Sequence, residues 1–237
     1  MSDTALDSSL LVTSSLKRSF SLGKNNTLEV LKGIDLTLKR GELVALLGDS
    51  GSGKSTLIQI LGTLDRPTSG SVTLDGVDLF KLNPKKQAQV RNQKIGFIYQ
   101  FHRLLPEFST LENVMMPLLI GRLDAKLAKE KACTILEKVG LKDRMLHRPG
   151  QLSGGEQQRV AIARSIVTNP VLLLADEPTG NLDRRTAWSV FELLQQLNQD
   201  LGLTCLMVTH NNELAQHLNR QVHMVDGCLA LQEKAEL

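Results

Sequence analysis

The sequence predicts one α/β domain of 237 residues that joins a parallel core to an antiparallel β subdomain and an inserted helical subdomain. Three observations carry this prediction. An apolar run at 42–47 leads into a glycine-rich loop and then a helical pattern at 56–61. A second apolar run at 170–175 precedes a helical stretch at 184–201, so strand and helix alternate again. Between these units, from about 101 to 168, the pattern is mainly helical, as expected of an insertion.

The first third of the chain has the pattern of antiparallel strands. Residues 1 to about 10 are expected to form a loose polar tail, and a strand is predicted at 11–20. Apolar residues alternate strictly near the end of 28–38, which indicates a half-buried strand. A further strand at 71–74 ends in an Asp-Gly turn. These strands would wrap around the core.

The helical subdomain is predicted to follow a strand at 94–100. One helix is expected at 109–119, with Ser109 or Thr110 as its N-cap. A second, amphipathic helix at 124–139 would end at Gly140. The core and β subdomain are then assigned to about 11–100 and 169–237.

After the helix at 184–201, the core pattern continues to the end of the chain. A strand is predicted at 203–209 and a helix at 211–218. Two short strands, at about 221–225 and 229–232, flank an Asp-Gly turn and indicate a hairpin.

Composition and charge limit the function classes. The net charge is only +3, which gives no electrostatic reason to expect nucleic acid as a partner. Three scattered cysteines without a metal-binding pattern are typical of reduced thiols in a cytosolic protein. No segment reaches the ~18–20 apolar residues that a bilayer span needs, and the acidic start is unlike a secretory signal. Any action at a membrane would therefore need another chain to hold the protein there.

A glycine-rich loop between the first core strand and its helix matches the pattern G-x-x-x-x-G-K-[ST] of nucleoside triphosphatases. The loop consists of Gly48, Asp49, Ser50, Gly51, Ser52, Gly53, Lys54, Ser55 and Thr56. Its glycines let backbone N–H groups approach phosphate oxygens, and the following helix turns the positive end of its dipole toward the anion. Lys54 supplies a cation for the outer phosphates, and the Ser55 hydroxyl is suited to magnesium. The loop alone predicts a nucleotide-binding site.

Two adjacent carboxylates, Asp176 and Glu177, follow the apolar strand that ends at Ala175. Ligands of parallel α/β sheets bind at the carboxyl ends of the strands. We therefore expect Asp176 near the magnesium ion and Glu177 near the γ-phosphate, where it would polarise a water molecule.

The segment 152–159, Leu-Ser-Gly-Gly-Glu-Gln-Gln-Arg, resembles the signature of the ATP-binding cassette (ABC) family. Ser153 is suited to cap a helix, and Gly154 and Gly155 expose N–H groups at its start, which makes an anion site. The resemblance covers about 11 to 231, with every expected motif in order. It identifies the fold as an ABC-type phosphate-loop core.

The resemblance implies a paired arrangement in which two copies enclose ATP and magnesium between them. It implies that Gln100 and His210 belong to the nucleotide site and that the loop 180–183 contacts the second copy. Catalytic roles would belong to Lys54, Gln100, Glu177 and His210, and magnesium ligation to Ser55, Gln100 and Asp176. Ser153, Gly154 and Gly155 would come from the mate.

Two positions depart from the usual family pattern. In the family, an aromatic residue in the first β region usually stacks on adenine. Here that position falls on Ser19-Phe20, and Phe20 is the aromatic residue available there; an alignment shifted by one residue would place Ser19 at this position instead. Asn211 follows His210 where relatives often carry aspartate.

Within the family, 92–106 and 111–119 resemble the ATPase subunits of bacterial lipoprotein-releasing systems. This implies integral membrane subunits as partners and a peripheral place on the cytoplasmic face of the inner membrane. The segment after Gln100 would dock the membrane subunits. Its apolar residues fit a docking surface and the core of the helical subdomain equally well; they are Phe101, Leu104, Leu105 and Phe108. The alternatives are an ATPase of a macrolide-efflux or cell-division complex, and a soluble cassette that acts on DNA or ribosomes.

Overall fold

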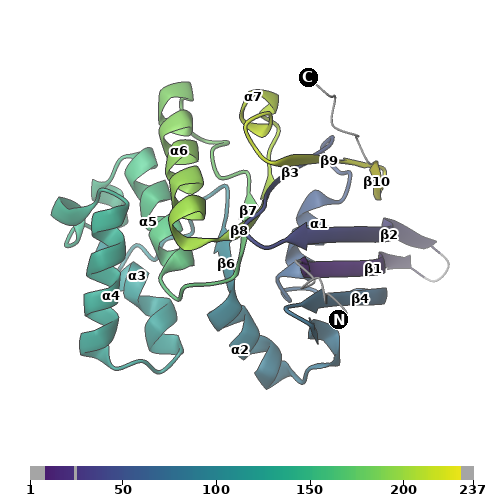
Figure 1. Ribbon diagram of the computed structural model, residues 1–237, viewed down its shortest axis with the longest axis horizontal. Helices are drawn as coiled ribbons and strands as arrows, with labels where there is room; N and C mark the ends of the chain where they lie inside the picture. Colours follow the sequence, from purple (N-terminus) through teal and green to yellow (C-terminus); the bar gives the residue numbers. More distant parts are fainter. Residues whose placement is uncertain (1–8, 24–25, 231–237) are drawn as a thin grey trace, which may run out of the picture.

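In a computed structural model, which describes residues 9–23 and 26–230, the centre of the molecule is a six-stranded sheet (Figure 1). Its order is β10-β9-β3-β8-β7-β6, and all neighbours pair in parallel except β10, which is antiparallel to β9. The strands are β3 (Leu43–Leu47), β6 (Ile95–Ile98), β7 (Leu172–Asp176), β8 (Thr204–Val208), β9 (Arg220–Val225) and β10 (Cys228–Ala230). This confirms the predicted α/β class.

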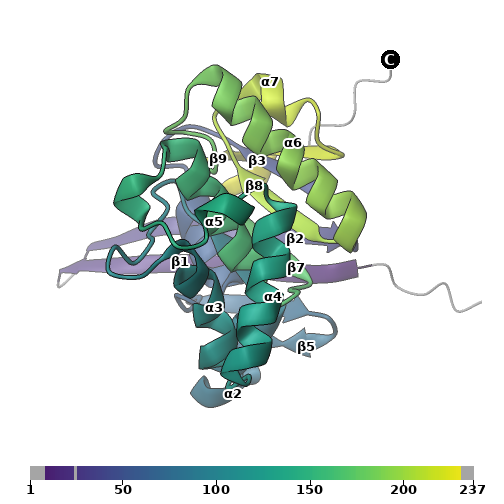
Figure 2. The same cartoon turned by 90° about the vertical axis from the view of Figure 1, so that its left-hand side faces the viewer.

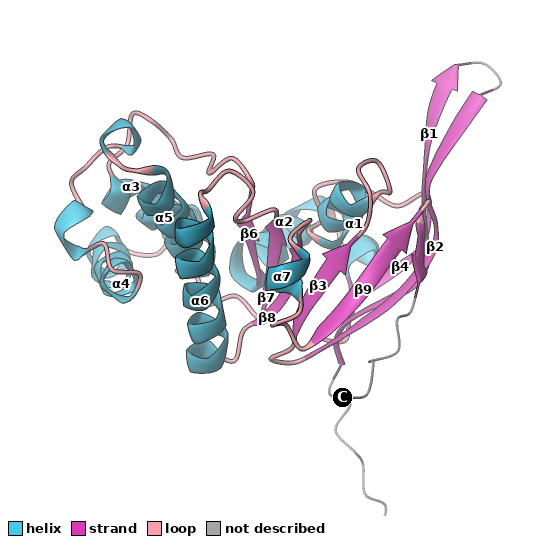
Figure 3. Ribbon diagram, turned by 90° about the horizontal axis from the view of Figure 1, so that it is seen from above, coloured by secondary structure: helices cyan, strands magenta, loops and turns pink. Residues whose placement is uncertain are grey.

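A second, antiparallel sheet in the order β2-β1-β4-β5 forms the β subdomain on the right of Figure 1. Its strands are β1 (Ser9–Gly23), β2 (Asn26–Lys39), β4 (Ser69–Leu74) and β5 (Val77–Asp78). The strand predicted at 11–20 is longer at both ends, because Leu10 is buried and the far end pairs with β2 in a projecting ribbon (Figure 3). Of the predicted tail, 1–8 lie outside the described residues, while Ser9 and Leu10 belong to β1.

Successive residues of the central strands face two different cores. In β7, Leu173 and Ala175 pack with the helical elements α3–α6, whereas Leu172 and Leu174 pack with α1 and the antiparallel sheet. Burial on both faces explains why these strands are continuously apolar. The helices that supply most of this packing are α1 (Lys54–Leu61), α3 (Thr110–Ile120), α4 (Ala125–Lys138), α5 (Gly154–Ile166) and α6 (Arg184–Leu201).

The helices α3, α4 and α5 follow β6 and precede β7, and Figure 2 shows them from the side on which they gather. Ser109 caps α3 in a capping box with Glu112, and Asp124 caps α4 through the N–H of Lys126. Gly140 follows α4 with a φ of +76°, which a side chain would make strained. The cap at Ser109 and the stop at Gly140 are therefore confirmed.

Helix α2 (Pro84–Lys94) is absent from the sequence prediction. Its signals lie at its start, where Asn83 accepts a hydrogen bond from the Lys86 N–H and Pro84 occupies the first turn. It lacks an apolar stripe, and Gln87 is its one buried residue. Helix α7 (Asn212–Ala215) is shorter than predicted.

The remaining helical elements are single 3-10 turns, η1 (Leu79–Lys81), η2 (Lys142–Arg144) and η3 (Pro149–Gln151). Across residues 9–23 and 26–230, every helix falls short of the length and apolarity needed to cross a membrane.

Candidate nucleotide-binding site

The carboxyl ends of β3, β6, β7 and β8 meet at one edge of the parallel sheet, and a hollow of about 270 Å³ opens there. It is lined by residues from segments far apart in the sequence: Val30, Ser50, Gly51, Gly53, Lys54, Ser55, Thr56, Gln100, Asp176, Glu177, Val208 and His210. Most of the predicted site residues are thus brought together. An adjoining hollow of about 700 Å³ shares Gln100, Glu177 and His210 with it and extends along the loop after β7.

The phosphate loop is seated against β9 and β2 through glycines. Gly48 has a φ of +146°, and a Cβ there would lie 2.2 Å from the carbonyl oxygen of Met224. Gly53 has a φ of +108° and precedes α1 as its N-cap, and a Cβ there would lie 2.9 Å from the carbonyl oxygen of Val30. Both positions need glycine because the backbone of a neighbouring strand occupies the space of a side chain.

The ammonium group of Lys54 lies inside the loop. Its Nζ donates hydrogen bonds to the carbonyl oxygens of Gly48 and Asp49, each at 2.7 Å, and lies 3.4 Å from Ser52 Oγ. Burial lowers the pKa of Lys54, and the nearby carboxylates of Glu177 and Asp176 act in the opposite direction. The two 2.7 Å hydrogen bonds hold the amine at the base of the loop.

Asp176 and Glu177 lie side by side at the end of β7. Burial raises the pKa of Asp176, and a hydrogen bond from Ser55 partly offsets this. Burial also raises the pKa of Glu177, while the neighbouring His210 lowers it. A buried pair of carboxylates with raised pKa values is stabilised by any cation that enters the hollow.

Glu177 has an unusual backbone for a residue with a side chain, with a φ of +51°. The Glu177 N–H donates to the carbonyl of Val208 at 3.0 Å, which ties the end of β7 to β8. His210 Nε2 lies 2.9 Å from Glu177 Oε1, without the angular geometry of a hydrogen bond. Strain of this kind concentrates at functional sites.

The oxygen donors at the hollow suit magnesium. The Ser55 hydroxyl, the Asp176 carboxylate and the Gln100 amide are hard ligands, and Ser55 and Asp176 already contact each other. Among the described residues, no three His, Cys, Asp or Glu side chains cluster as a metal cage.

The segment at the start of α5 lies apart from the hollow. Ser153 caps α5 in a capping box, in which its N–H and hydroxyl donate to Glu156 Oε2 at 2.8 and 2.9 Å. The bond from the Ser153 N–H, and after it the bond from the hydroxyl, lower the pKa of Glu156. The carboxylate also pairs with Arg144 at 2.9 Å. A Cβ on Gly155 would lie 2.5 Å from Thr186 Cγ2, so this helix start abuts the start of α6.

Phe20 lies on β1, outside the lining of the hollow, and is 37% exposed. The guanidinium of Arg18 lies over one face of its ring, 4.3 Å from the centroid. Asp65 holds Arg18 through two contacts of 2.9 Å. One face of the ring is thus covered by a cation.

The segment after Gln100 is tied to α5 by contacts that sequence patterns do not reveal. Arg164 of α5 donates to the carbonyl oxygens of His102 and Arg103, both at 2.8 Å. Arg103 has a φ of +47°, so Arg164 holds a strained turn in place.

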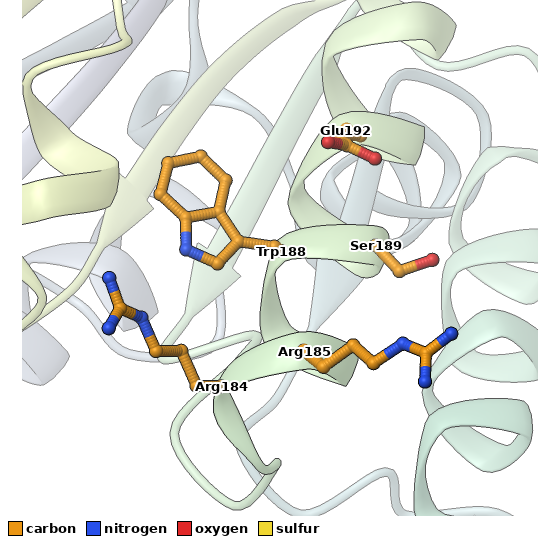
Figure 4. Close-up of a pocket in the computed structure, with 5 residues that line it drawn as sticks. All are labelled: Arg184, Arg185, Trp188, Ser189 and Glu192. Atoms are coloured by element: carbon orange, nitrogen blue, oxygen red, sulfur yellow. The ribbon is translucent and has the colours of Figure 1, made fainter.

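A further hollow of about 630 Å³ runs along the outer face of α6 (Figure 4). One helix supplies its lining, which is Arg184, Arg185, Trp188, Ser189 and Glu192. Arg184 pairs with Glu213 at 2.8 Å, and Ser189 accepts a hydrogen bond from Arg159. Arg184 and Arg185 point in opposite directions, so the lining does not converge on a ligand.

Comparison with known proteins places this geometry in a family. The sequence profile described as "ABC transporter" matches residues 31–180, more than half of the chain. The chain belongs to the ABC transporter family. The names phosphate loop, signature and D-loop are used below for 48–56, 152–156 and 180–183, the segments that resemble those motifs of the family.

Relatives in this family resemble the chain over nearly its whole length. The chain is 51% identical to a protein named "Lipoprotein-releasing system ATP-binding protein LolD" from Legionella pneumophila, over 94% of this chain and 98% of the relative. A protein of the same name from Geobacter metallireducens is 54% identical, over 93% and 97%.

Solved ABC cassettes share the fold. The cassette MJ0796, in a dimeric post-hydrolysis state bound to ADP and Pi, superposes with a TM-score of 0.86 at 36% identity, covering 96% of this chain and 99% of that one. CbiO1 from Clostridium perfringens, part of an ABC transporter complex, gives a TM-score of 0.85 at 28% identity, covering 95% and 88%. The chain is an ATP-binding cassette ATPase.

Proposed function

We propose that the chain is the ATP-hydrolysing subunit of a bacterial inner-membrane complex that releases lipoproteins toward the outer membrane. The observation that carries this proposal is the similarity, along nearly the whole chain, to ATP-binding proteins of lipoprotein-releasing systems. The assembled hollow supports it, because residues of the phosphate loop, the two carboxylates after β7, Gln100 and His210 lie together there, as phosphoryl transfer from ATP requires.

In the proposed mechanism, the phosphate loop binds the triphosphate and Lys54 contacts its outer phosphates. The 3.4 Å contact from Lys54 to Ser52 Oγ is the weakest of its three, so a phosphate oxygen replaces it at least cost. Ser55, Asp176 and Gln100 would hold magnesium, which neutralises developing charge on the phosphates. Phe20 would stack on adenine with the ring face that Arg18 does not cover.

Glu177 is the proposed general base, and His210 the proposed partner of the γ-phosphate. Glu177 is half-buried beside the lysine cation and accepts the proton of an attacking water when it is ionised. His210 reaches Glu177 from the end of β8, which places an N–H donor next to the base. Positioned charges of this kind supply most of the rate in phosphoryl transfer.

A second copy of the chain would complete the site. Ser153, Gly154 and Gly155 lie outside the hollow of their own chain. The Ser153 N–H is bonded to Glu156, so the N–H groups of Gly154 and Gly155 at the start of α5 would be the ones to contact phosphates bound to a mate. The dimeric state of the related cassette MJ0796 supports this arrangement.

The partners in the membrane would dock near the end of β6. Phe101 is 70% exposed and Leu105 is also exposed, whereas Leu104 packs on the core. The two exposed side chains are therefore the better candidates for contact with an integral membrane subunit. Through such subunits the chain would sit peripherally on the cytoplasmic face of the inner membrane, with no nucleic acid as partner.

The experiment that tests this proposal uses the Glu177→Gln variant as bait, loaded with ATP and magnesium, on detergent-solubilised membranes of the organism that carries it. We expect capture of a membrane subunit with few spans and a large periplasmic domain. Capture of a drug-efflux or cell-division subunit would overturn the proposed cargo and leave the proposed ATPase mechanism standing. Capture of ribosomes or nucleic acid alone would overturn the transport role.

A further inference from the structure

Asn181, in the loop between β7 and α6, forms two hydrogen bonds with a single residue 81 positions earlier. Its Nδ2 donates to the backbone carbonyl oxygen of Gln100 at 3.1 Å. Its Oδ1 accepts from Gln100 Nε2 at 3.4 Å. The side chain of Asn181 thus contacts both the backbone and the amide of Gln100.

This pair of contacts determines which way both amide groups face. A backbone carbonyl oxygen only accepts, so the nitrogen of Asn181 has to face it and the oxygen of Asn181 has to face the Gln100 side chain. That oxygen in turn needs a donor, so Gln100 presents Nε2 to it. The Oε1 atom of Gln100 is then turned away from Asn181 and remains available as a ligand.

Asn181 is itself exposed, but the residues beside it are held by contacts of their own. Leu182 packs against the main hydrophobic cluster, and Asp183 caps α6 by accepting from the N–H and hydroxyl of Thr186. Gly180 lies against the amide, since a Cβ there would be 3.2 Å from Gln100 Nε2. A ligand held by a fixed neighbour keeps its orientation when the cation arrives.

We propose that Asn181 is a positioning residue that orients the Gln100 amide so that its oxygen faces the magnesium of bound ATP. The inference rests on the proposed function, because it takes Gln100 to be a metal ligand. It adds a residue that acts through Gln100 and touches neither the nucleotide nor the cation. The D-loop would then serve the metal site of its own chain as well as the contact with a mate.

The test measures metal binding without turnover. Binding of Mn²⁺, a paramagnetic substitute for Mg²⁺, is titrated by electron paramagnetic resonance in the presence of ATP, in full-length chain carrying Glu177→Gln. Adding Asn181→Ala is expected to weaken Mn²⁺ binding by about fivefold to tenfold, the equivalent of one hydrogen bond. ATP affinity in EDTA should stay within about twofold, because Asn181 does not contact the nucleotide.

A second background separates orientation from a general disturbance of the loop. In Gln100→Glu both terminal atoms of residue 100 are oxygens, so neither orientation excludes the cation. Asn181→Ala should then cause no further loss of Mn²⁺ affinity. Asn83→Ala, which removes a remote helix cap, is the control for loss of an asparagine and should leave Mn²⁺ affinity unchanged.

Two results would overturn the inference: unchanged Mn²⁺ affinity in Asn181→Ala with Gln100 present, or an equal loss in the Gln100→Glu background. Failure of the parent Glu177→Gln chain to bind ATP at all is a different result. It would overturn the proposed function, and with it the basis of this inference.

Discussion

Replacement of Gly48 by alanine tests how the phosphate loop is seated. The added Cβ would lie 2.2 Å from the carbonyl oxygen of Met224 and 3.1 Å from Ser52 Oγ. The φ of +146° belongs to a region that costs a side chain about 1–3 kcal/mol, and overpacking against a backbone adds about 1–3 kcal/mol. We expect Gly48→Ala to lower the free energy of unfolding by about 3 kcal/mol or more.

The matched control is Gly41→Ala. Gly41 has a φ of +72°, and nothing lies within 4 Å of an added Cβ, so only the backbone strain of about 1 kcal/mol applies. In a chain of this size, 1 kcal/mol lowers the melting temperature by about 2–4 °C, so we expect losses of about 6–12 °C for Gly48→Ala and 2–4 °C for Gly41→Ala. Denaturant and thermal unfolding, followed by circular dichroism, measure both.

Nucleotide binding gives a second readout for the same pair. To relieve the contact with Met224, the loop of Gly48→Ala has to move. The move misplaces the N–H groups that would bind phosphate, and the loss of one or two such hydrogen bonds should weaken ATP binding by about tenfold or more. Titration with a fluorescent ATP analogue should show this loss, while Gly41→Ala binds as wild type. Equal stability and equal affinity of the two variants would refute the seating of the loop against β9.

Four further predictions concern the site and its partners. Glu177→Gln should retain ATP and nearly abolish phosphate release, and wild-type turnover would contradict its role as base. Because burial raises the pKa of Glu177 above its usual 4.5, the carboxylate is lost as pH falls through that raised value, so the acid limb of the ATPase profile should lie above pH 4.5. Phe20→Ala should weaken ATP binding about tenfold while Phe20→Tyr preserves it, and equal binding by both would exclude stacking on adenine. Phe101→Ser should leave stability within about 0.5 kcal/mol yet reduce co-purification of the membrane subunit, whereas Val77→Ser, on the remote β5, should not.

The site motifs were predictable from sequence because each is local. The phosphate loop, the carboxylates after β7 and the cap at Ser153 are fixed by residues within a few positions of one another, and the parallel sheet then brings the strand ends to one edge. The burial of β7 on both faces makes that strand easy to identify as well.

Other features depend on contacts that no local pattern contains. The bonds between Asn181 and Gln100 join residues 81 apart, and those from Arg164 join α5 to a turn about 60 residues earlier. Helix α2 escaped prediction because it is polar almost all round, so only Asn83 and Pro84 signalled it. Phe101 and Leu104 are both apolar residues of one segment, so the sequence does not tell which is exposed; the structure shows that Phe101 is exposed and that Leu104 packs on the core.

The central claim is that ATP hydrolysis by this chain drives lipoprotein release, and the most direct measurement is where lipoproteins reside when the chain is depleted. Cells depleted of the chain are fractionated, and lipoproteins of the inner and outer membranes are quantified after complementation with wild type or Glu177→Gln. The account predicts retention in the inner membrane on depletion, recovery with wild type and none with Glu177→Gln. Normal lipoprotein distribution in depleted cells would contradict it.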